Sequence, residues 1–272
     1  EPNAAGEAIK AVARYFAMLR HTDFAKVMED ILTILSAVYD YPVDIEFTCN
    51  FKDKERYRIN LLQCRPLQTR GLGKTIKFPE RLDKSHYYFA SAGNFMGGNV
   101  RLPVQYIVFV KIKPYLELNE SQKYAIANQI GVLNHILKNK HAILVGPGRW
   151  GTTTPSLGVP VRFTDLCNMD AICEVSYDSL GLMPELSYGS HFFQDIVESN
   201  IFYAALFQKD AKVHFNEDKI LTKENVLENL LENSKEEVIY SDVIHVADLG
   251  DDGGEIYSDI VEQKLICTDK HL

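Results

Sequence analysis

The sequence predicts an α/β protein of two domains, with α+β as the alternative class. Strand-like and helix-like segments alternate over residues 85–272, which is typical of an α/β domain with a mixed sheet. Residues 1–70 show a different order, in which helical spacing of apolar residues is followed by a hairpin. Between them, residues 71–84 are rich in charges and in glycine or proline, so we interpret this segment as a linker.

Two amphipathic helices are predicted before the hairpin. Ala4–Arg20 and Asp23–Tyr39 both place apolar residues three or four positions apart, and Asp23 is a candidate N-cap for the second helix. Pro42 ends this helical region.

The hairpin is predicted from two short strand-like runs, Val43–Cys49 and Tyr57–Arg65, on either side of a charged turn. Because side chains alternate between the faces of a strand, a register with Asp44 opposite Arg65 also sets Glu46 opposite Gln63. The four polar groups would then share one face. The other face would be apolar and would consist of Val43, Ile45, Phe47, Leu62 and Cys64.

Carboxylates, an amide and a guanidinium on one face suit a magnesium–triphosphate complex. Mg²⁺ prefers hard oxygen ligands, and arginine binds phosphate oxygens through two parallel hydrogen bonds. The alternative is an ordinary surface hairpin with an Asp44–Arg65 cross-strand pair, which contributes at most about 1 kcal/mol to stability.

The hairpin sequence resembles the end of the nucleotide-binding domain of phosphoenolpyruvate synthase and pyruvate phosphate dikinase. That family pattern is an acidic D-I-E strand followed by an L-Q-x-R-P strand, and the chain has DIE at 44–46 and LQCRP at 62–66. The resemblance covers residues 1–70. It implies the C-terminal piece of an ATP-grasp domain, with ATP and Mg²⁺ as cofactors.

The resemblance also implies roles for individual residues. Glu46 and Gln63 would contact the metal and the nucleotide, Asp44 would support them, and Arg65 would stabilise the transferred phosphoryl group. The family's carrier-histidine motif and its phosphoenolpyruvate-binding signature do not occur in this chain. We therefore expect the chain to belong to a longer protein and to be inactive by itself.

The second domain is predicted to contain both strands and helices. The predicted strands are Val104–Lys111, Ala142–Val145, Val159–Phe163, Ala171–Val175, Ile201–Phe207, and a tail of Val243–Asp248 and Glu255–Cys267 around an Asp-Asp-Gly-Gly turn. The predicted helices are Ser121–Leu137, Ser190–Ser199 and Thr222–Asn233.

A glycine-rich loop follows the strand Ala142–Val145. It matches G-x-G-x-x-G through Gly146, Gly148 and Gly151, but the prolines that follow argue against the helix that a dinucleotide site needs. Its backbone amides, with Arg149 and Thr152, could hold an anion. The alternative is a tight turn in which Trp150 covers a core edge and Arg149 is solvated.

His191 and Asp195 form a second candidate site in this domain. Their four-residue spacing would bring a carboxylate to the imidazole on one face of a helix, as a general base or a phosphate-accepting histidine requires. The alternative is a capped helix start with a histidine that is satisfied locally.

Composition narrows the class of function. A net charge of −8 argues against nucleic-acid and anionic-membrane partners, and no apolar run approaches the ~20 residues of a membrane span. The five cysteines lack zinc-type spacing and there is no signal peptide, so we expect a cytoplasmic protein with reduced thiols.

The leading hypothesis is an ATP- and Mg²⁺-dependent phosphotransferase with a pyruvate-like acceptor. A non-catalytic nucleotide- or anion-sensing module is the alternative, and an interaction domain that keeps only the ATP-grasp scaffold is a third. The sequence leaves the acceptor, the role of residues 85–272 and the oligomeric state open.

Overall fold

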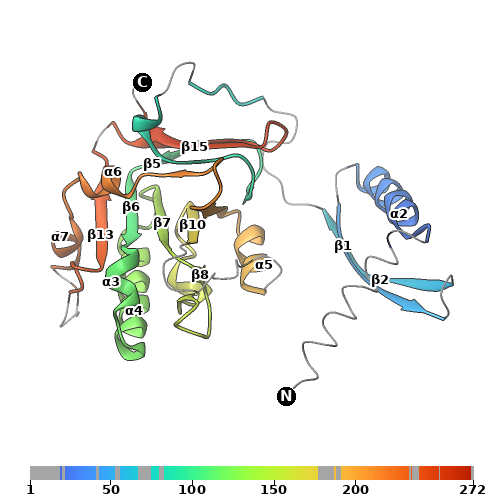
Figure 1. The fold of residues 1–272 in the computed structure, drawn as a ribbon, viewed down its shortest axis with the longest axis horizontal. Helices are drawn as coiled ribbons and strands as arrows, with labels where there is room; N and C mark the ends of the chain where they lie inside the picture. Colours follow the sequence, from blue (N-terminus) through green and yellow to red (C-terminus); the bar gives the residue numbers. More distant parts are fainter. Residues whose placement is uncertain are drawn as a thin grey trace. The chain divides into compact units, whose positions relative to one another are not determined.

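The computed structural model describes residues 19, 22–40, 43–52, 56–66, 75–79, 83–176, 187, 191–232, 234, 239–250 and 252–270. The chain divides into two compact units, Glu1–Leu67 and Gln68–Leu272. Both mix helices with β-sheet, so the protein is α/β or α+β in class (Figure 1). In the described part, no helix is long and apolar enough to cross a membrane.

Over its described residues, the first unit, called the hairpin unit below, is one helix packed on a two-stranded sheet. Helix α2 (Phe24–Tyr39) lies against the antiparallel strands β1 (Val43–Phe51) and β2 (Tyr57–Pro66). Phe24 is buried there, with its ring centroid 6.0 Å from that of Phe47 and 5.9 Å from that of Tyr57. The predicted helix Ala4–Arg20 lies outside the described residues except for Leu19.

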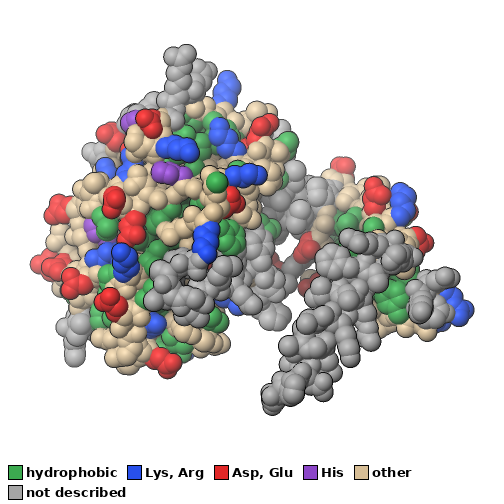
Figure 2. Space-filling model, viewed as in Figure 1, with side chains coloured by type: hydrophobic (Ala, Val, Ile, Leu, Met, Phe, Trp, Pro, Cys, Tyr) green, Lys and Arg blue, Asp and Glu red, His purple; other side chains and the backbone are tan. Residues whose placement is uncertain are grey.

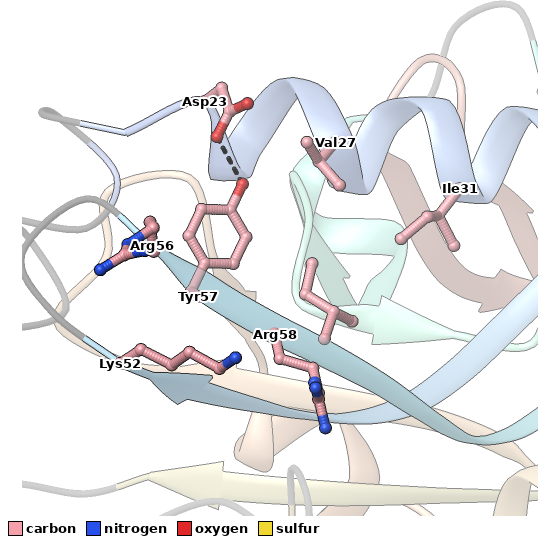
Figure 3. Close-up of a pocket in the computed structure, with 8 residues that line it drawn as sticks. Asp23, Val27, Ile31, Lys52, Arg56, Tyr57 and Arg58 are labelled. Atoms are coloured by element: carbon pink, nitrogen blue, oxygen red, sulfur yellow. Dashed lines mark hydrogen bonds between the residues drawn. The ribbon is translucent and has the colours of Figure 1, made fainter.

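Asp23 precedes α2 but does not cap it with its side chain. The amide of Phe24 donates instead to Thr22 Oγ1, over 3.2 Å, and the carboxylate of Asp23 accepts a 2.5 Å hydrogen bond from Tyr57 Oη (Figure 3). The predicted cap residue therefore ties the helix to the sheet.

The second unit, called the α/β unit below, is built on a six-stranded sheet of order β13-β6-β7-β10-β11-β4. The central four strands are parallel, and β13 and β4 pair antiparallel at the edges. The strands are β4 (Phe95–Met96), β6 (Tyr106–Val110), β7 (Ala142–Pro147), β10 (Ala171–Ser176), β11 (Phe202–Phe207) and β13 (Ile244–Asp248).

Parallel neighbours in this sheet follow one another in chain order, so the described sheet contains no point where the strand order reverses. Dinucleotide-binding sheets place their ligand at such a point. The topology thus agrees with the sequence argument against a dinucleotide site at the glycine loop.

A five-stranded antiparallel sheet of order β12-β3-β15-β14-β5 covers one face of the six-stranded sheet (Figure 1). Between the sheets lies an apolar core that includes Phe109, Val145 and Cys173 from one and Ile256 and Leu265 from the other. The strands are β3 (Tyr87–Ser91), β5 (Val100–Val104), β12 (His214–Phe215), β14 (Gly254–Asp259) and β15 (Lys264–Asp269).

Helices cover the other face of the six-stranded sheet and form a second core. Helix α4 (Glu120–Ile136) buries Ile126, Ile130 and Leu133 there, together with residues of α5 (His191–Glu198) and α7 (Leu227–Leu231). Asn119 caps α4 through a capping box with Gln122. The described part of the unit also contains the short helices α3 (Ile112–Leu116) and α6 (Glu217–Leu221), two 3₁₀ turns (Lys84–His86 and Phe163–Asp165), and the strand pair β8 (Arg149–Trp150) and β9 (Gly158–Val159).

Several predicted elements have different limits in the structure. Thr222–Asn233 was predicted as one helix, but α6 and α7 are separate and Asn225 between them bridges to Ala247. Val159–Phe163 was predicted as a strand, but only Val159 lies in one, and Phe163 begins a 3₁₀ turn.

The glycine-rich turn before β14 also differs from the prediction. It connects strands of different sheets, because β13 pairs with β6 and β14 pairs with β15. Glu255–Cys267 is itself a hairpin, whose turn includes Gln263 at a φ of 50°.

Part of the predicted linker 71–84 packs on the α/β unit. In the described segment 75–79, the ring of Phe78 lies 6.0 Å from that of Tyr257, and the Lys264 ammonium lies 4.4 Å from the Phe78 ring centroid. An apolar ring in a charged connector therefore has a defined place against the five-stranded sheet.

Candidate functional site

The hairpin has the predicted register over its polar residues. Asp44 pairs with Arg65 and Glu46 pairs with Gln63. Helix α2 packs on the face that carries Phe47 and Tyr57, so these four positions lie on the face opposite the helix. The juxtaposition that the sequence predicted is therefore present in the backbone.

The apolar face differs from the prediction at one residue. A bulge between Glu46 and Phe47 shifts the register, so that Leu61 rather than Leu62 stands opposite Phe47. Leu62 is left without a cross-strand partner in the register, and 64% of its surface is exposed. Sequence alternation alone could not locate this bulge, because Leu61 and Leu62 are identical residues.

The polar positions near the bulge face solvent. Glu46 and Gln63 are exposed and Asp44 is half-buried, while the side chain of Arg65 lies outside the described residues. Oxygen donors such as Glu46 and Gln63 fit Mg²⁺, which usually takes one or two protein ligands and fills its shell with water and phosphate. The described residues hold no cluster of three or more His, Cys, Asp or Glu side chains suited to a metal ion.

The glycine loop of the α/β unit uses its amides internally. The amides of Gly148, Arg149 and Gly151 donate to the carbonyls of Val175, Leu157 and Val159, over 2.9–3.1 Å. The amide of Trp150 donates to Glu174 Oε1 over 3.0 Å. The possible anion site drew on such amides together with Arg149 and Thr152, and the structure gives each of these amides a protein acceptor.

Packing accounts for two of the motif glycines. A Cβ on Gly146 would meet the Trp150 ring at 2.6 Å, and a Cβ on Gly151, whose φ is +73°, would meet the Phe192 ring at 2.4 Å. Trp150 is fully buried, and its Nε1 donates to the carbonyl of Cys173 over 3.1 Å. The part of the alternative interpretation that places Trp150 at the core is confirmed, whereas Arg149 is half-buried and forms the short strand β8 with Trp150.

Glu174 is the polar centre beneath this loop. It is fully buried in β10 and accepts hydrogen bonds from the amides of Trp150 and Ser187, from the Ser187 hydroxyl, and from Tyr203 Oη over 2.7 Å. Burial raises the pKa of Glu174, and the four hydrogen bonds oppose that rise. The sequence signal that we missed is a lone glutamate inside the apolar run AICEV.

The remaining predicted loop and helix residues do not form a common site in the described structure. Thr152 is buried and exchanges hydrogen bonds with the backbone of Thr154, and Arg149 is half-buried. His191 begins α5 and Asp195 is exposed on the same helix, but the side chain of His191 lies outside the described residues.

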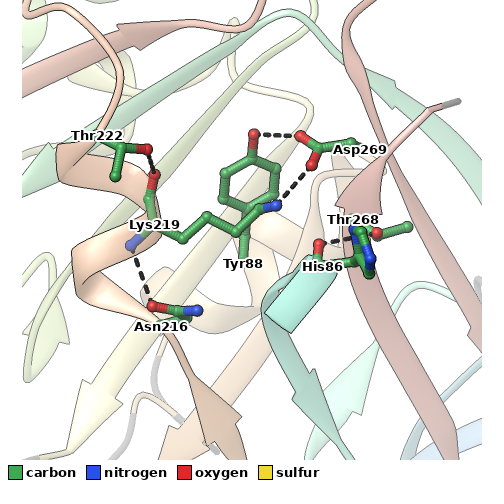
Figure 4. Close-up of polar contacts among 7 residues, drawn as sticks. All are labelled: His86, Tyr88, Asn216, Lys219, Thr222, Thr268 and Asp269. Carbon is green, nitrogen blue, oxygen red and sulfur yellow. Dashed lines mark hydrogen bonds and ion pairs between the residues drawn. The ribbon is translucent and has the colours of Figure 1, made fainter. Parts of the chain in front are cut away.

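A half-buried polar cluster joins α6 to the five-stranded sheet (Figure 4). Asp269 accepts hydrogen bonds of 2.5 Å from both Lys219 Nζ and Tyr88 Oη, and the ammonium lies 4.9 Å from the Tyr88 ring centroid. Burial alone would raise the pKa of Asp269, but these hydrogen bonds outweigh it and the pKa lies below its usual value. All three groups satisfy one another, which indicates a structural clamp.

Comparison of the chain with protein families, with curated proteins and with solved structures found no match.

Proposed function

We propose that the polar face of the hairpin is part of an ATP- and Mg²⁺-dependent phosphotransferase site of the ATP-grasp type, resembling that of phosphoenolpyruvate synthase and pyruvate phosphate dikinase. The observation that carries the proposal is the register, which sets Asp44 opposite Arg65 and Glu46 opposite Gln63. A pyruvate-like acid is the proposed acceptor of the phosphoryl group.

Exposure supports a binding role for these positions. Glu46 and Gln63 project from the face that α2 leaves uncovered, so burial in the hairpin core does not account for their residue types. An exposed carboxylate beside an amide oxygen offers hard donors to a divalent cation. Asp44, directly across from Arg65, would hold the arginine in place by a charged pair.

Each residue would have a distinct task in the reaction. Glu46 and Gln63 would hold Mg²⁺ and the nucleotide, and the bound Mg²⁺ would neutralise charge on the phosphates. Arg65 would face the oxygens of the transferred phosphoryl group, where negative charge is spread in the transition state. Catalysis would then consist mainly of positioning and charge stabilisation.

The decisive variant is Arg65→Ala in the complete protein that contains this chain. Phosphoryl transfer from radiolabelled ATP should fall about 10²–10³-fold, as for loss of a preorganised donor at a developing charge, while nucleotide affinity changes little. Glu46→Gln should instead weaken binding of Mg²⁺·ATP, because it removes a ligand charge.

Matched controls use residues of the same type away from the polar pairs. Arg162 is exposed in the α/β unit, and Asn60 is an exposed amide on β2 whose Nδ2 donates to Thr48 Oγ1 over 3.1 Å. Arg162→Ala and Asn60→Ala should both retain transfer. Near-normal turnover of Arg65→Ala, or an equal loss in Arg162→Ala, would overturn the proposal.

Among the described residues, no specific contact favours the sensing-module alternative. The amides that its anion site would use in the glycine loop, at Gly148, Arg149, Trp150 and Gly151, donate to protein acceptors.

A further inference from the structure

Helix α6 lies where the two sheets of the α/β unit meet. It contacts β3 of the five-stranded sheet and β13 of the six-stranded sheet. Ile220 of α6 is fully buried in the apolar core between the sheets, while Leu221 beside it is exposed. The amide of Asn216, just before the helix, donates to the carbonyl of Tyr88 over 2.9 Å. Residues 216–223, called the α6 segment below, therefore cover part of this core with a single buried side chain.

The clamp of Lys219, Asp269 and Tyr88 holds the α6 segment to the five-stranded sheet (Figure 4). The Lys219 ammonium lies 2.5 Å from the Asp269 carboxylate, and the two side chains are 17% and 33% exposed. Burial alone would raise the pKa of Asp269, but the hydrogen bonds from Lys219 and Tyr88, together with the charge of Lys223, keep it below the ordinary 3.8. The Asp269 carboxylate therefore stays charged between pH 5.5 and pH 7.5.

His245 of β13 meets the same segment from the six-stranded sheet. It is 7% exposed, and its Nε2 has no hydrogen-bond partner among the described residues. The imidazole hydrogen-bonds with the backbone of Ile220 and Lys223, and the positive charge of Lys111, just after β6, acts on it. A protonated imidazole carries an N–H on both nitrogens. Protonation would thus bury a charge near Lys111 and an N–H without an acceptor, which is unfavourable as long as the α6 segment stays in place.

Glu217 of α6 is a titratable group that acts in the opposite direction. Its side chain is half-buried, and the charges of Lys111 and Lys113 act on it. Burial, followed by the charge of the exposed Asp218, raises the pKa of Glu217 above the ordinary 4.5. The closed position of the α6 segment therefore favours protonated Glu217 and is strengthened by this group as the pH falls. The net effect of pH on the segment is the difference between His245 and Glu217.

We propose that α6 is an acid-sensitive latch of the α/β unit, which opens when His245 takes up a proton and which the clamp holds shut when His245 is neutral. In the open form the contact between Lys219 and Asp269 is broken, and Ile220 and His245 reach water. Burial, followed by the charge of Lys111, holds the pKa of His245 in the closed form below 6.5. The contribution of His245 to closing is therefore fully present above pH 6.5 and is lost as the pH falls below it. The latch belongs to the α/β unit alone and does not depend on the proposed nucleotide site.

The test measures amide hydrogen exchange of the 272-residue chain by NMR at pH 7.5 and pH 5.5, with each rate divided by its intrinsic value. The amides of Lys219 and Thr222 report on the latch, because each is hydrogen-bonded within the α6 segment over 3.0 Å. The amide of the buried Phe202 donates to the carbonyl of Asp170 over 2.9 Å and reports on unfolding of the whole unit.

The latch amides should open more readily than the reference amide. At both pH values their opening constant should exceed that of Phe202 at least about tenfold, as expected for local opening. Between pH 7.5 and pH 5.5 the opening constant of the latch should rise at least about threefold, since a single proton can raise it by at most about tenfold per pH unit.

Two variants separate the titrating group from the clamp. In His245→Asn the opening constant of the latch should stay level or fall between pH 7.5 and pH 5.5, because Glu217 then acts alone. Lys219→Met keeps the aliphatic stem and removes the ammonium, so the opening constant should rise about tenfold at both pH values. The rise with falling pH should persist in Lys219→Met, since His245 is intact.

His135→Asn and Lys138→Met are the matched controls, because both residues are exposed in or next to α4, on the opposite face of the six-stranded sheet from α6. Each should change the opening constant of the latch less than about twofold. Equal opening constants for the latch amides and Phe202 in the native protein would show that α6 opens only with the whole unit. The native pH response in His245→Asn would exclude His245 as the titrating group, and an unchanged constant in Lys219→Met would exclude the clamp.

Discussion

The hairpin unit and the α/β unit place their motif residues in opposite environments. Glu46 and Gln63 of the hairpin are exposed, whereas Trp150 and Glu174 of the α/β unit are fully buried and bonded to their surroundings. The difference teaches that a motif whose residues are explained by packing needs no ligand to account for it. A motif whose residues are exposed still needs such an explanation. By that criterion the hairpin motif is the functional candidate and the glycine loop is part of the core.

The two units also differ in how they use apolar side chains. In the α/β unit, two extensive cores enclose the six-stranded sheet on both faces. In the described hairpin unit, large side chains such as Ile34 and Val38 remain 63% and 74% exposed. Hydrophobic side chains are accordingly visible on its surface (Figure 2). The stability of the chain should therefore depend mostly on the α/β unit.

The largest expected effect tests whether Trp150 belongs to the core. Trp150→Ala should lower the free energy of unfolding of the α/β unit by about 3–5 kcal/mol, because it removes a fully buried ring and the hydrogen bond from its Nε1 to the carbonyl of Cys173. Urea denaturation followed by far-UV circular dichroism measures the change. A loss below about 1 kcal/mol would contradict the packing explanation of the motif.

A smaller effect separates the contribution of packing from that of backbone strain at Gly151. Gly151 and Gly250 share a φ of +73°, but a Cβ at Gly151 would meet the Phe192 ring at 2.4 Å and a Cβ at Gly250 would meet nothing within 4 Å. Gly151→Ala should therefore cost about 1–3 kcal/mol more than Gly250→Ala, through overpacking. Thermal unfolding of both variants gives the comparison, and equal costs would assign the whole effect to φ.

The smallest effect is a pH dependence that originates in the α/β unit. His245 is 7% exposed and its Nε2 is buried without a hydrogen-bond partner. Burial, followed by the nearby charge of Lys111, lowers its pKa below the ordinary 6.5. Below pH 6.5 the unfolded chain binds a proton at this histidine more readily than the folded chain does. The contribution of His245 to the free energy of unfolding is therefore fully present above pH 6.5 and is lost as the pH falls below it.

The slope of this loss cannot exceed about 1.4 kcal/mol per pH unit for a single proton. The variant His245→Asn places a polar amide where the imidazole Nδ1 lies, and this amide cannot titrate. The free energy of unfolding of the variant should therefore change less than that of the native protein between pH 7.5 and pH 5. Glu174 is present in both proteins, so its own titration cancels in the difference. Parallel stability profiles would exclude His245 as the source.

Local sequence patterns predicted the features that depend on neighbouring residues. Alternation and charge predicted the hairpin and the Asp44–Arg65 register, and apolar spacing predicted α4, whose observed bounds are Glu120–Ile136. The glycine loop was harder, because Gly151 makes room for Phe192, a residue of a distant helix. Such a contact leaves no trace in the loop's own sequence.

Long-range pairing explains the other misses. No strand was predicted in residues 85–103, where β3 pairs with β15 near the other end of the unit and β5 pairs with β14. The polar centre at Glu174 likewise takes its donors from Trp150, Ser187 and Tyr203, which come together only in the folded sheet. A buried glutamate in a strand was the single local sign of it.

The pairing of β3 with β15 sets the order in which parts of the α/β unit can fold. Tyr87 and Thr268 are register partners although most of the unit separates them along the chain. Contacts between distant segments form slowly, because the chain must first close a large loop. During synthesis the parallel strands and α4 can assemble before β15, the partner strand of β3, has left the ribosome. The inner face of the six-stranded sheet, including Phe109 and Val145, stays uncovered in that interval, which makes it the surface that a chaperone would shield.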